Sequence, residues 1–534
     1  MKLYVKRDIE WLYPDEDEIG TKEYKQEVIV LHTAKGSPTG FQLLVTDVEK
    51  SISVTDCGLG PKAEINILQE VLVNFNTAEV ESGFGNKAFV YLEKQKSCPK
   101  QCTRIAPFWV YDAYKPYEGE KVILDRQAFY ICFPVTMETE AGVYRKELEI
   151  RSGADVKQVI VELHVYDAGL PEENHFQVTN WFSIDNMASF HEMPKYSEAH
   201  FQMIDAYAKA MRRMRQTHFM LTPNQVEVQE KAGIYQFDFT MFEKIAKIFF
   251  ENGFQKLEFG TLGTRKRVTN EELYVLNLEE VPVESEKGKE VLHSFFQGLY
   301  KVAEKNDWLD KIIFHIADEP DEPYSAIERR MSQYAFIHRV MREYFKDAAV
   351  CEAVKTSHFK KYIDILVPLS KTYEEAEEEF RDSGREIWVY TCCVPTGDYY
   401  QRFLDVPLVA NRILFWTLAK HGITGYLHWG LNQMEPDQHP FTQTNQYHTY
   451  GDGVCLPAGD SHILYPDKEK LYYSMRLEAC RKGSEDVELL TQLKEKNKGK
   501  FMELTSNFQR FHGTCDTEEF SRLHVELLKE LSKM

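Results

Sequence analysis

Residues 1 to 170 carry short apolar segments in which hydrophobic and polar side chains alternate. The alternation is clearest in VYRKELEI (143–150) and VKQVIVELHV (156–165). A period of two residues is typical of a half-buried β-strand. Gly, Pro, Asp and Asn separate the segments and provide the turns between strands. We therefore predict an N-terminal β-sandwich domain over residues 1–170.

The pattern changes after the acidic, Pro-containing segment DAGLPEENH (167–175), which we interpret as a linker. From there to residue 435, short apolar strands alternate with longer helical segments, which favours βα units around a parallel sheet. Eight candidate strands can be counted: 176–182, 217–223, 254–260, 311–320, 350–356, 362–370, 386–395 and 422–432. Eight is the strand number of a TIM-like (β/α)8 barrel, which we predict for residues 171–470.

Two alternatives to a complete barrel stay open, an open doubly wound sheet and a barrel that lacks a helix. The connection between the fifth and sixth strands is too short for a full helix. Beyond the barrel, residues 471–534 are charged and carry a helical pattern, ending in the amphipathic SRLHVELLKELSKM. We predict that they form a helical C-terminal segment packed on the barrel.

The net charge of the chain argues against two classes of binding partner. The chain has 534 residues, with 64 Lys and Arg against 84 Asp and Glu, and a net charge of −20. Such a chain is a poor match to a nucleic-acid backbone or an anionic membrane face. No apolar run reaches the ~18 residues that a membrane span needs. The first residues, MKLYVKRDIEWLYPDEDE, lack the apolar stretch of a secretory signal, so we expect a cytoplasmic protein.

The end of the fourth predicted strand carries the most informative residues. The segment HIADEPDEP places Asp318 and Glu319 directly after an apolar run. In barrels of this type the active site lies at the C-terminal ends of the strands. Neighbouring carboxyls can push their pKa values apart, so that one is protonated and the other ionised. A glycosidase needs this division, an acid for the leaving oxygen and an anion for the positive centre.

The arrangement of carboxylates favours a substrate-assisted reaction. The seventh strand ends in YTCCVP without a carboxylate, so a separate protein nucleophile is poorly supported. In the substrate-assisted route the 2-acetamido oxygen of the sugar attacks its own anomeric carbon. Consecutive strand residues face opposite sides, so the backbone must turn at Asp318 and Glu319 for both to reach one site. The alternatives are a glycosidase that pairs Glu319 with Asp398 or Glu435, and a glycan-binding scaffold without catalysis.

Other strand ends offer aromatic and amide side chains that suit a sugar, because aromatic faces stack on C–H surfaces and amides bind hydroxyls. The candidate substrate-binding residues are Asn180, Trp181, His218, Tyr390, Trp429 and Asn432. We interpret His315, inside the fourth strand, as a packed core histidine, and Arg265 as part of a solvated turn. Nothing in the sequence predicts a metal site or a cofactor, and it leaves the oligomeric state open.

Four segments together resemble glycoside hydrolase family 123 and its uncharacterised barrel relatives. They are FPVTMETEAGVYRKELEI (133–150), ADEP (317–320), GYLHWGLN (425–432) and YPDKEKLYYSMRLEACRKGSEDVELL (465–490). The resemblance implies a retaining, exo-acting β-N-acetylgalactosaminidase with a carbohydrate substrate. It implies that Asp318 stabilises the oxazoline-forming acetamido group and that Glu319 is the acid/base. Within the last segment, Ser474, Arg476, Glu478, Arg481 and Asp486 are interpreted as structural.

Overall fold

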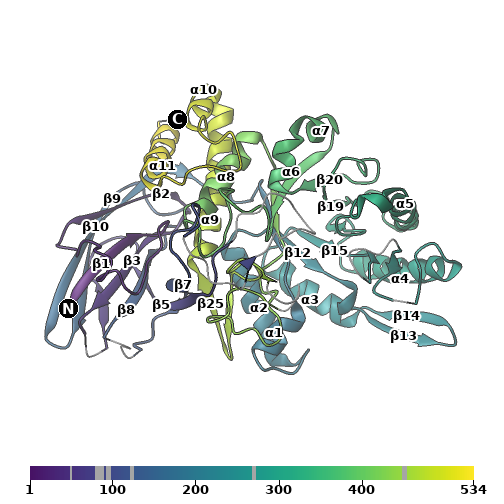
Figure 1. Ribbon diagram of the computed structural model, residues 1–534, viewed down its shortest axis with the longest axis horizontal. Coiled ribbons are helices and arrows are strands. Elements are labelled where there is room, and N and C mark those ends of the chain that lie inside the picture. The colour runs from purple at the N-terminus through teal and green to yellow at the C-terminus, as the bar shows by residue number, and fades with distance from the viewer. Residues whose placement is uncertain are drawn as a thin grey trace. The chain divides into compact units, whose positions relative to one another are not determined.

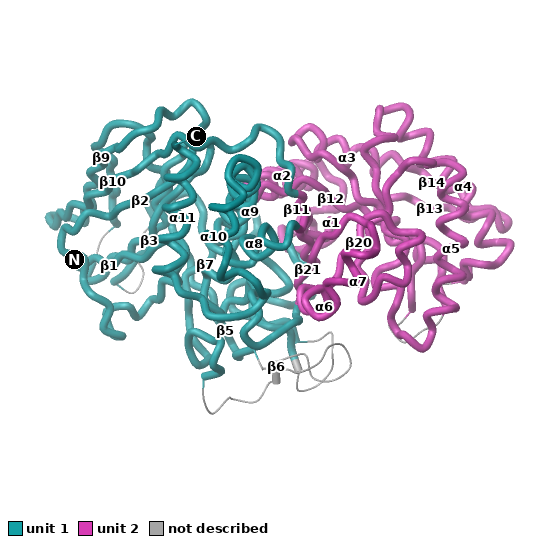
Figure 2. The backbone as a smooth tube through the Cα atoms, turned by 90° about the horizontal axis from the view of Figure 1, so that it is seen from above, with its two compact units in different colours: residues 1–176, 393–422, 430–534 teal, residues 177–392, 423–429 magenta. Residues whose placement is uncertain are grey.

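The computed structural model describes residues 1–48, 51–77, 90–91, 98–120, 125–266, 272–278, 280–447 and 454–533. They divide into two compact units (Figure 2). Unit 1 comprises residues 1–176, 393–422 and 430–534, and unit 2 comprises residues 177–392 and 423–429. The domain boundaries at residues 170 and 470 stay a prediction.

Unit 1 contains two larger β-sheets (Figure 1). The first has seven strands in the order β1-β3-β8-β5-β7-β25-β24, and the second has four in the order β2-β10-β9-β4. Their bounds are β1 (Lys2–Arg7), β2 (Val28–Lys35), β3 (Thr39–Thr46), β4 (Ser53–Asp56), β5 (Glu64–Val73), β7 (Phe108–Pro116), β8 (Gln127–Phe133), β9 (Gly142–Ser152), β10 (Asp155–Gly169), β24 (Tyr465–Asp467) and β25 (Lys470–Ser474). The short strands β6 (Val90–Tyr91) and β23 (Val454–Cys455) pair separately.

One hydrophobic core joins the two sheets of unit 1. It includes Phe41 and Ile131 from the first sheet and Leu148 and Val161 from the second, all fully buried. In β9 and β10 these inward residues alternate with polar ones, as the period of two predicts. The two sheets therefore share one core in the manner of a β-sandwich.

The C-terminal part of the chain returns to the first sheet of unit 1. Strand β25 pairs antiparallel with β7, and helix α9 (Met475–Lys496) follows it. The helix packs on α8 (Ala410–His421), and α10 (Lys498–Leu504) and α11 (Thr517–Leu531) complete the unit. Charged side chains in the first half of α9 are buried in pairs, such as Arg476 with Asp112 on β7 at 2.8 Å. These contacts agree with a structural role for this segment.

Unit 2 contains all eight strands that the sequence pattern predicts for the barrel. They are β11 (Gln177–Asn180), β12 (His218–Leu221), β15 (Lys256–Phe259), β18 (Ile312–Phe314), β19 (Cys351–Val354), β20 (Ile365–Pro368), β21 (Glu386–Thr391) and β22 (Gly425–His428). The α-helices of unit 2 are α1 (Ile184–Phe190), α2 (Glu198–Arg213), α3 (Thr240–Glu251), α4 (Glu286–Lys305), α5 (Ile327–Tyr344), α6 (Ser370–Glu375) and α7 (Glu377–Asp382), whereas α8, between β21 and β22 in the sequence, belongs to unit 1. Residues 355–364, all of them described, form no helix, as their length predicts.

Smaller elements decorate the loops of unit 2. Two antiparallel hairpins and two short 3-10 helices occur there: β13 (Glu227–Lys231) with β14 (Ile234–Asp238), β16 (Gly263–Thr264) with β17 (Tyr274–Val275), η1 (Pro223–Gln225) and η2 (Tyr324–Ala326). Figure 1 shows the hairpin of β13 and β14 beside α4. No helix in the described part of the chain is long and apolar enough to cross a membrane.

The structure corrects the prediction of a closed (β/α)8 barrel. The parallel strands form one sheet in the order β11-β22-β21-β20-β19 and another in the order β12-β15-β18. Between β18 and the region of β19, the backbone pairing of the described residues is limited to an isolated bridge between Phe314 and Val350. Between β11 and β12, the hydroxyl of Thr217 accepts the backbone N–H of Val178 at 2.9 Å, in the place of a strand carbonyl. Unit 2 is therefore a mixed α/β structure with an interrupted ring of parallel strands.

Candidate active site

The carboxylate pair lies on a bend in the backbone rather than on a strand. Strand β18 ends at residue 314, because the N–H groups of Ile316 and Ala317 donate to Glu352 Oε2, at 2.8 and 3.1 Å, instead of joining a ladder. The chain bends over residues 317–319, and Glu319 has a φ of +44°. This left-handed conformation costs a non-glycine residue about 1–3 kcal/mol and is typical of functional sites. Both Asp318 and Glu319 are half-buried.

Glu319 is held by a tyrosine from another strand. The hydroxyl of Tyr390, at the end of β21, donates to Glu319 Oε1 at 2.6 Å. Burial and the negative charge of Glu319 raise the pKa of Tyr390 well above its usual value. Tyr390 therefore keeps its proton and remains a hydrogen-bond donor to Glu319 across the neutral pH range.

The two carboxyls interact electrostatically. Burial, followed by the negative charge of Glu319, raises the pKa of Asp318 to about 7. The positive charges of Arg265 and His315 act in the opposite direction without cancelling this increase. Because the carboxyls interact, the retained proton belongs to the pair. An acid and an anion are thus available side by side near neutral pH.

A fully buried ionic triad lies next to the pair. His315 Nε2 is 2.8 Å from Glu258 Oε2, and His315 Nδ1 is 3.4 Å from Glu352 Oε1. All three side chains have 0% exposure. Burial alone would lower the pKa of His315, but its two carboxylate partners raise it to about 10. His315 is therefore a core histidine, as expected, but a positively charged one.

Close packing fixes the backbone around His315. A Cβ atom added to Gly260 would lie 2.4 Å from the carbonyl oxygen of His315 and 2.5 Å from its Cβ. Only glycine lets the chain after β15 approach the chain after β18 so closely.

The triad also orients Trp181, a predicted sugar-binding residue. The indole Nε1 of Trp181 donates to Glu258 Oε2 at 3.1 Å. Its ring meets that of His315 edge to face, with centroids 5.3 Å apart. Trp181 follows β11 and is partly exposed. A hydrogen bond and a ring contact thus hold a partly exposed aromatic surface in one orientation.

Arg265 braces the bend from the loop that follows β15. Its Nη2 donates to the carbonyl oxygen of Asp318 at 2.7 Å, and its Nη1 donates to that of Glu322 at 2.9 Å. The sequence pattern favoured a solvated turn for this residue. The structure gives its guanidinium a specific task, which is to hold both ends of the segment from residue 318 to residue 322.

Two predicted ligands are buried among protein partners. The amide of Asn180 donates to Gln216 Oε1 at 3.3 Å, and the residue is buried. His218 is also buried, with Nδ1 2.8 Å from Thr217 Oγ1 and its ring edge to face with Trp388. Burial is the main cause that lowers the pKa of His218 to about 4, so it is neutral at pH 7. The substrate-binding role of both residues stays a prediction.

The remaining two predicted ligands follow β22. Trp429 is partly exposed and belongs to unit 2, which contains the carboxylate pair. Asn432 belongs to unit 1, where it is fully buried and its backbone bridges to His462. The structure therefore brings together Asp318, Glu319, Tyr390 and Trp181 within unit 2 by direct contacts or through the triad.

Comparison with known families identifies the family of the chain. The sequence model described as the glycoside hydrolase 123 catalytic domain matches residues 181–493, more than half of the chain. The chain belongs to glycoside hydrolase family 123. Membership of this family supports a glycosidase, which acts on a carbohydrate substrate. No curated protein matches the chain.

Solved structures agree on the fold. A family 123 glycoside hydrolase from Clostridium perfringens, studied for glycolipid glycan hydrolysis, is 13% identical, with a TM-score of 0.72. The alignment covers 99% of this chain and 96% of that one. A family 39 enzyme from Xanthomonas axonopodis pv. citri is 9% identical over 59% of this chain and 67% of its own, with a TM-score of 0.40. That score is too low to support any argument.

The candidate site contains residues that the sequence reasoning missed. Glu258 and Glu352 are carboxylates inside the apolar strands β15 and β19, and Arg265 follows β15. An acidic residue in a buried strand is costly unless it is paired, so Glu258 and Glu352 inside apolar strands were a signal that each has a partner, although the sequence does not name it. In the described ranges, no group of three or more His, Cys, Asp or Glu side chains is arranged to hold a metal ion.

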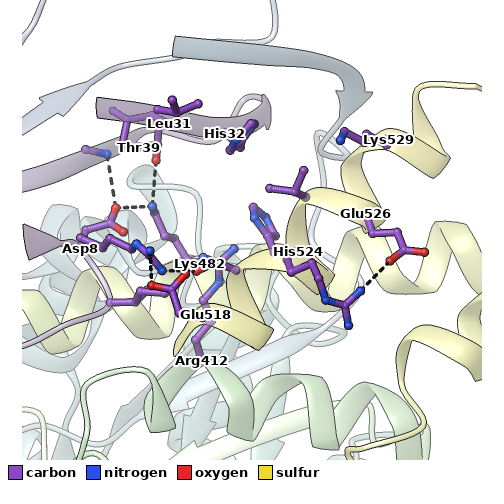
Figure 3. Close-up of a pocket in the computed structure, with 17 residues that line it drawn as sticks. Asp8, Leu31, His32, Thr39, Arg412, Lys482, Glu518, His524, Glu526 and Lys529 are labelled. Carbon is purple, nitrogen blue, oxygen red and sulfur yellow. Dashed lines mark hydrogen bonds and ion pairs between the residues drawn. The ribbon is translucent and has the colours of Figure 1, made fainter. Parts of the chain in front are cut away.

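A cavity of about 580 Å³ in unit 1 has a different character (Figure 3). Strands β2 and β3, the chain after β1 and helices α8, α9 and α11 line it. Each of its three carboxylates contacts a cation: Asp8 with Lys482, Glu518 with Arg7 and Glu526 with Arg522. Carboxylates that are already paired with cations are poorly suited to the acid and anion roles of a glycosidase.

Proposed function

We propose that this family 123 glycosidase removes terminal β-linked N-acetylhexosamine, GalNAc in particular, from glycans with retention of configuration. The observation that carries the proposal is the neighbouring pair Asp318 and Glu319, placed on one bend and coupled so that the pair keeps a proton to about pH 7. Two carboxyls with one proton between them match the needs of a substrate-assisted glycosidase.

In the first step, the acetamido oxygen of the bound sugar attacks the anomeric carbon. The bond to the glycosidic oxygen breaks, and Glu319 gives that oxygen its proton, so that the leaving group departs as a neutral alcohol. Asp318, ionised at this stage, accepts a hydrogen bond from the acetamido N–H and stabilises the positive charge of the oxazolinium ring. Tyr390 keeps Glu319 in position through the bond to Oε1.

In the second step, water attacks the anomeric carbon from the face that the leaving group left. Glu319, now ionised, takes a proton from this water, and the ring opens to restore the acetamido group. Two inversions at the same carbon give overall retention. Trp181, oriented by Glu258, is proposed to stack on the terminal sugar.

The buried carboxylates near the pair do not compete for the role of nucleophile. Glu258 and Glu352 both have 0% exposure and are bound to His315. Moving either to the anomeric carbon would break a buried ion pair, which costs about 3–5 kcal/mol. This supports the substrate's own acetamido group as the nucleophile.

The decisive experiment compares 4-nitrophenyl β-glycosides of GalNAc, GlcNAc and Gal. We expect turnover of the β-GalNAc compound, slower turnover of β-GlcNAc and none of β-Gal, because β-Gal lacks the acetamido oxygen. Turnover of β-Gal would favour the alternative that pairs Glu319 with Asp398 or Glu435, and Asp398→Asn and Glu435→Gln variants would then show which of them acts. If none is hydrolysed, a glycan-binding scaffold becomes the better hypothesis.

The pH dependence should respond to Glu352. Its negative charge is among the groups that raise the pKa of Asp318. The pair must hold a proton for the first step, so wild-type kcat/KM is expected to fall as the pH rises through about 7. Glu352→Gln removes the charge but keeps an acceptor for the bend, so this alkaline limb should move to lower pH.

The matched control for this pH profile is Glu290→Gln, an exposed carboxylate on α4. It should leave the alkaline limb where the wild type has it. An alkaline limb that is unmoved in Glu352→Gln would contradict the assignment of the limb to the Asp318 and Glu319 pair.

A further inference from the structure

An exposed aromatic side chain follows the carboxylate bend. Tyr324 begins η2, five residues after Glu319, and is 61% exposed. Its ring meets the ring of His358 edge to face, with centroids 5.9 Å apart. His358 is also exposed and follows β19. Two exposed rings in contact offer a ligand an aromatic face and a ring nitrogen side by side.

The loops that carry the two rings are fastened to each other. Asp321, only 2% exposed, accepts the backbone N–H groups of Lys355 and Thr356 at 2.8 and 2.7 Å. The Thr356 hydroxyl also donates to Asp321, at 3.0 Å, and lies 2.8 Å from His358 Nδ1. The Lys355 ammonium forms an ion pair with the Glu322 carboxylate. A buried carboxylate and an ion pair thus fix the relative position of the two loops.

The same segment is tied to the carboxylate pair. The N–H of Glu322 donates to the carbonyl oxygen of Glu319 at 3.0 Å, which closes a tight turn. Tyr324 is two residues beyond this turn, and two residues span at most about 7 Å. The turn and the two residues after it together span at most about 14 Å, so the loop that carries Tyr324 stays within a few sugar residues of Glu319.

We propose that Tyr324 and His358 form a subsite for the sugar residue on the leaving-group side of the scissile bond. This rests on the proposed function, in which Glu319 protonates the glycosidic oxygen. In that function Asp318 holds the acetamido group of the terminal sugar, so we place the next sugar on the Glu319 side, where the turn closed by Glu322 keeps the loop of Tyr324 nearby. The tyrosine ring offers a face to sugar C–H groups. His358, with Nδ1 engaged by Thr356, offers Nε2 to a hydroxyl.

If Tyr324 and His358 form this subsite, they should matter only when the leaving group contains a sugar. The test compares β-GalNAc fluoride, which has no sugar on the leaving-group side, with a disaccharide that ends in β-linked GalNAc. Tyr324→Ala should lower kcat/KM for the disaccharide about tenfold and leave the fluoride within about twofold of wild type. Tyr324→Phe should behave as wild type because it keeps the ring. Ile234→Ala, an exposed change on the hairpin of β13 and β14, is the control.

The outcomes separate this subsite from the function on which it rests. Unchanged fluoride turnover in Tyr324→Ala also proves that the variant is folded. Equal losses on both substrates, or no loss on either, would overturn the subsite and leave the proposed function intact. A wild-type enzyme that hydrolyses neither substrate would overturn both.

Discussion

Replacing Glu319 by glutamine is expected to lower kcat/KM for a β-linked GalNAc disaccharide about 10²–10⁴-fold, the usual contribution of a general acid. A sugar alkoxide is a poor leaving group and needs the proton that glutamine cannot give. The 4-nitrophenolate ion leaves without protonation, so the loss on the 4-nitrophenyl glycoside should be much smaller. Because kcat/KM reports the first irreversible step, the slower hydrolysis of the intermediate does not obscure this contrast.

For Asp318→Asn, in contrast, the loss of activity should not depend on the leaving group. The negative charge of Asp318 is needed to form the oxazolinium ring whatever the leaving group is. We therefore expect a loss of about 10²–10³-fold on both substrates, the size seen when one group that stabilises transition-state charge is removed. The difference between the two variants, measured on the same two substrates, identifies which carboxyl is the acid.

Glu328→Gln is the matched control for these variants, since it removes an exposed carboxylate at the start of α5. Its kcat/KM should stay within about threefold of wild type on both substrates. If Asp318→Asn were selective for the disaccharide and Glu319→Gln were not, the two roles would have to be exchanged. If neither variant lost activity, the pair would not be the catalytic centre.

The hydrophobic pattern predicted the strands of unit 2 but not their lengths. All eight appear within the predicted ranges, yet the fourth, predicted over 311–320, ends at residue 314. The segment HIA is as apolar as a strand, and only the tertiary structure shows that Glu352 accepts the N–H groups that a strand would use. The local hydrophobic pattern indicates which residues are buried. It does not indicate which distant residues accept the hydrogen bonds of their backbone N–H groups.

The same limit applies to closure of the barrel. A count of eight strands is compatible with a closed ring, but closure depends on stagger and tilt between neighbours, which periodicity does not encode. The pattern places Thr217 first in the second predicted strand. In the structure its hydroxyl accepts the hydrogen bond from the N–H of Val178, which a carbonyl of that strand would accept in a continuous sheet. The return of β25 to the N-terminal sheet is likewise invisible in the sequence, because the end of β7 at Pro116 and the start of β25 at Lys470 are 354 positions apart.

At the candidate site, the sequence pattern pointed to the carboxylate pair but not to the residues that support it. Asp318 and Glu319 stand out because two carboxylates end an apolar run, and the need for a turn between them is met by the φ of Glu319. Their supports, Glu258 and Glu352, each appear as a single acid in a strand. Only the structure shows that both contact His315 and form a triad with it.

This triad gives the largest expected effect on stability. His315→Leu should lower the free energy of unfolding by about 3–5 kcal/mol, because it leaves two carboxylates buried without their cation. The comparison is urea unfolding of wild type and variant, followed by tryptophan fluorescence. His218→Leu is the matched control, a buried histidine that is neutral at pH 7, and should cost only about 1 kcal/mol.

The pH dependence of this loss tests whether the charge of His315 is its cause. Folding raises the pKa of His315 from its usual 6.5 to about 10. The stabilisation is therefore complete below pH 6.5 and disappears as the pH rises through about 10. The difference between wild type and His315→Leu should be greatest at pH 6 and shrink toward pH 10. The difference for His218→Leu should instead grow slightly as the pH rises past the usual histidine pKa of 6.5, because the unfolded histidine then loses its proton, and stay constant above that. A difference for His315→Leu that does not change with pH would mean that the ring contributes by packing, and the triad would then hold Trp181 without a charged centre.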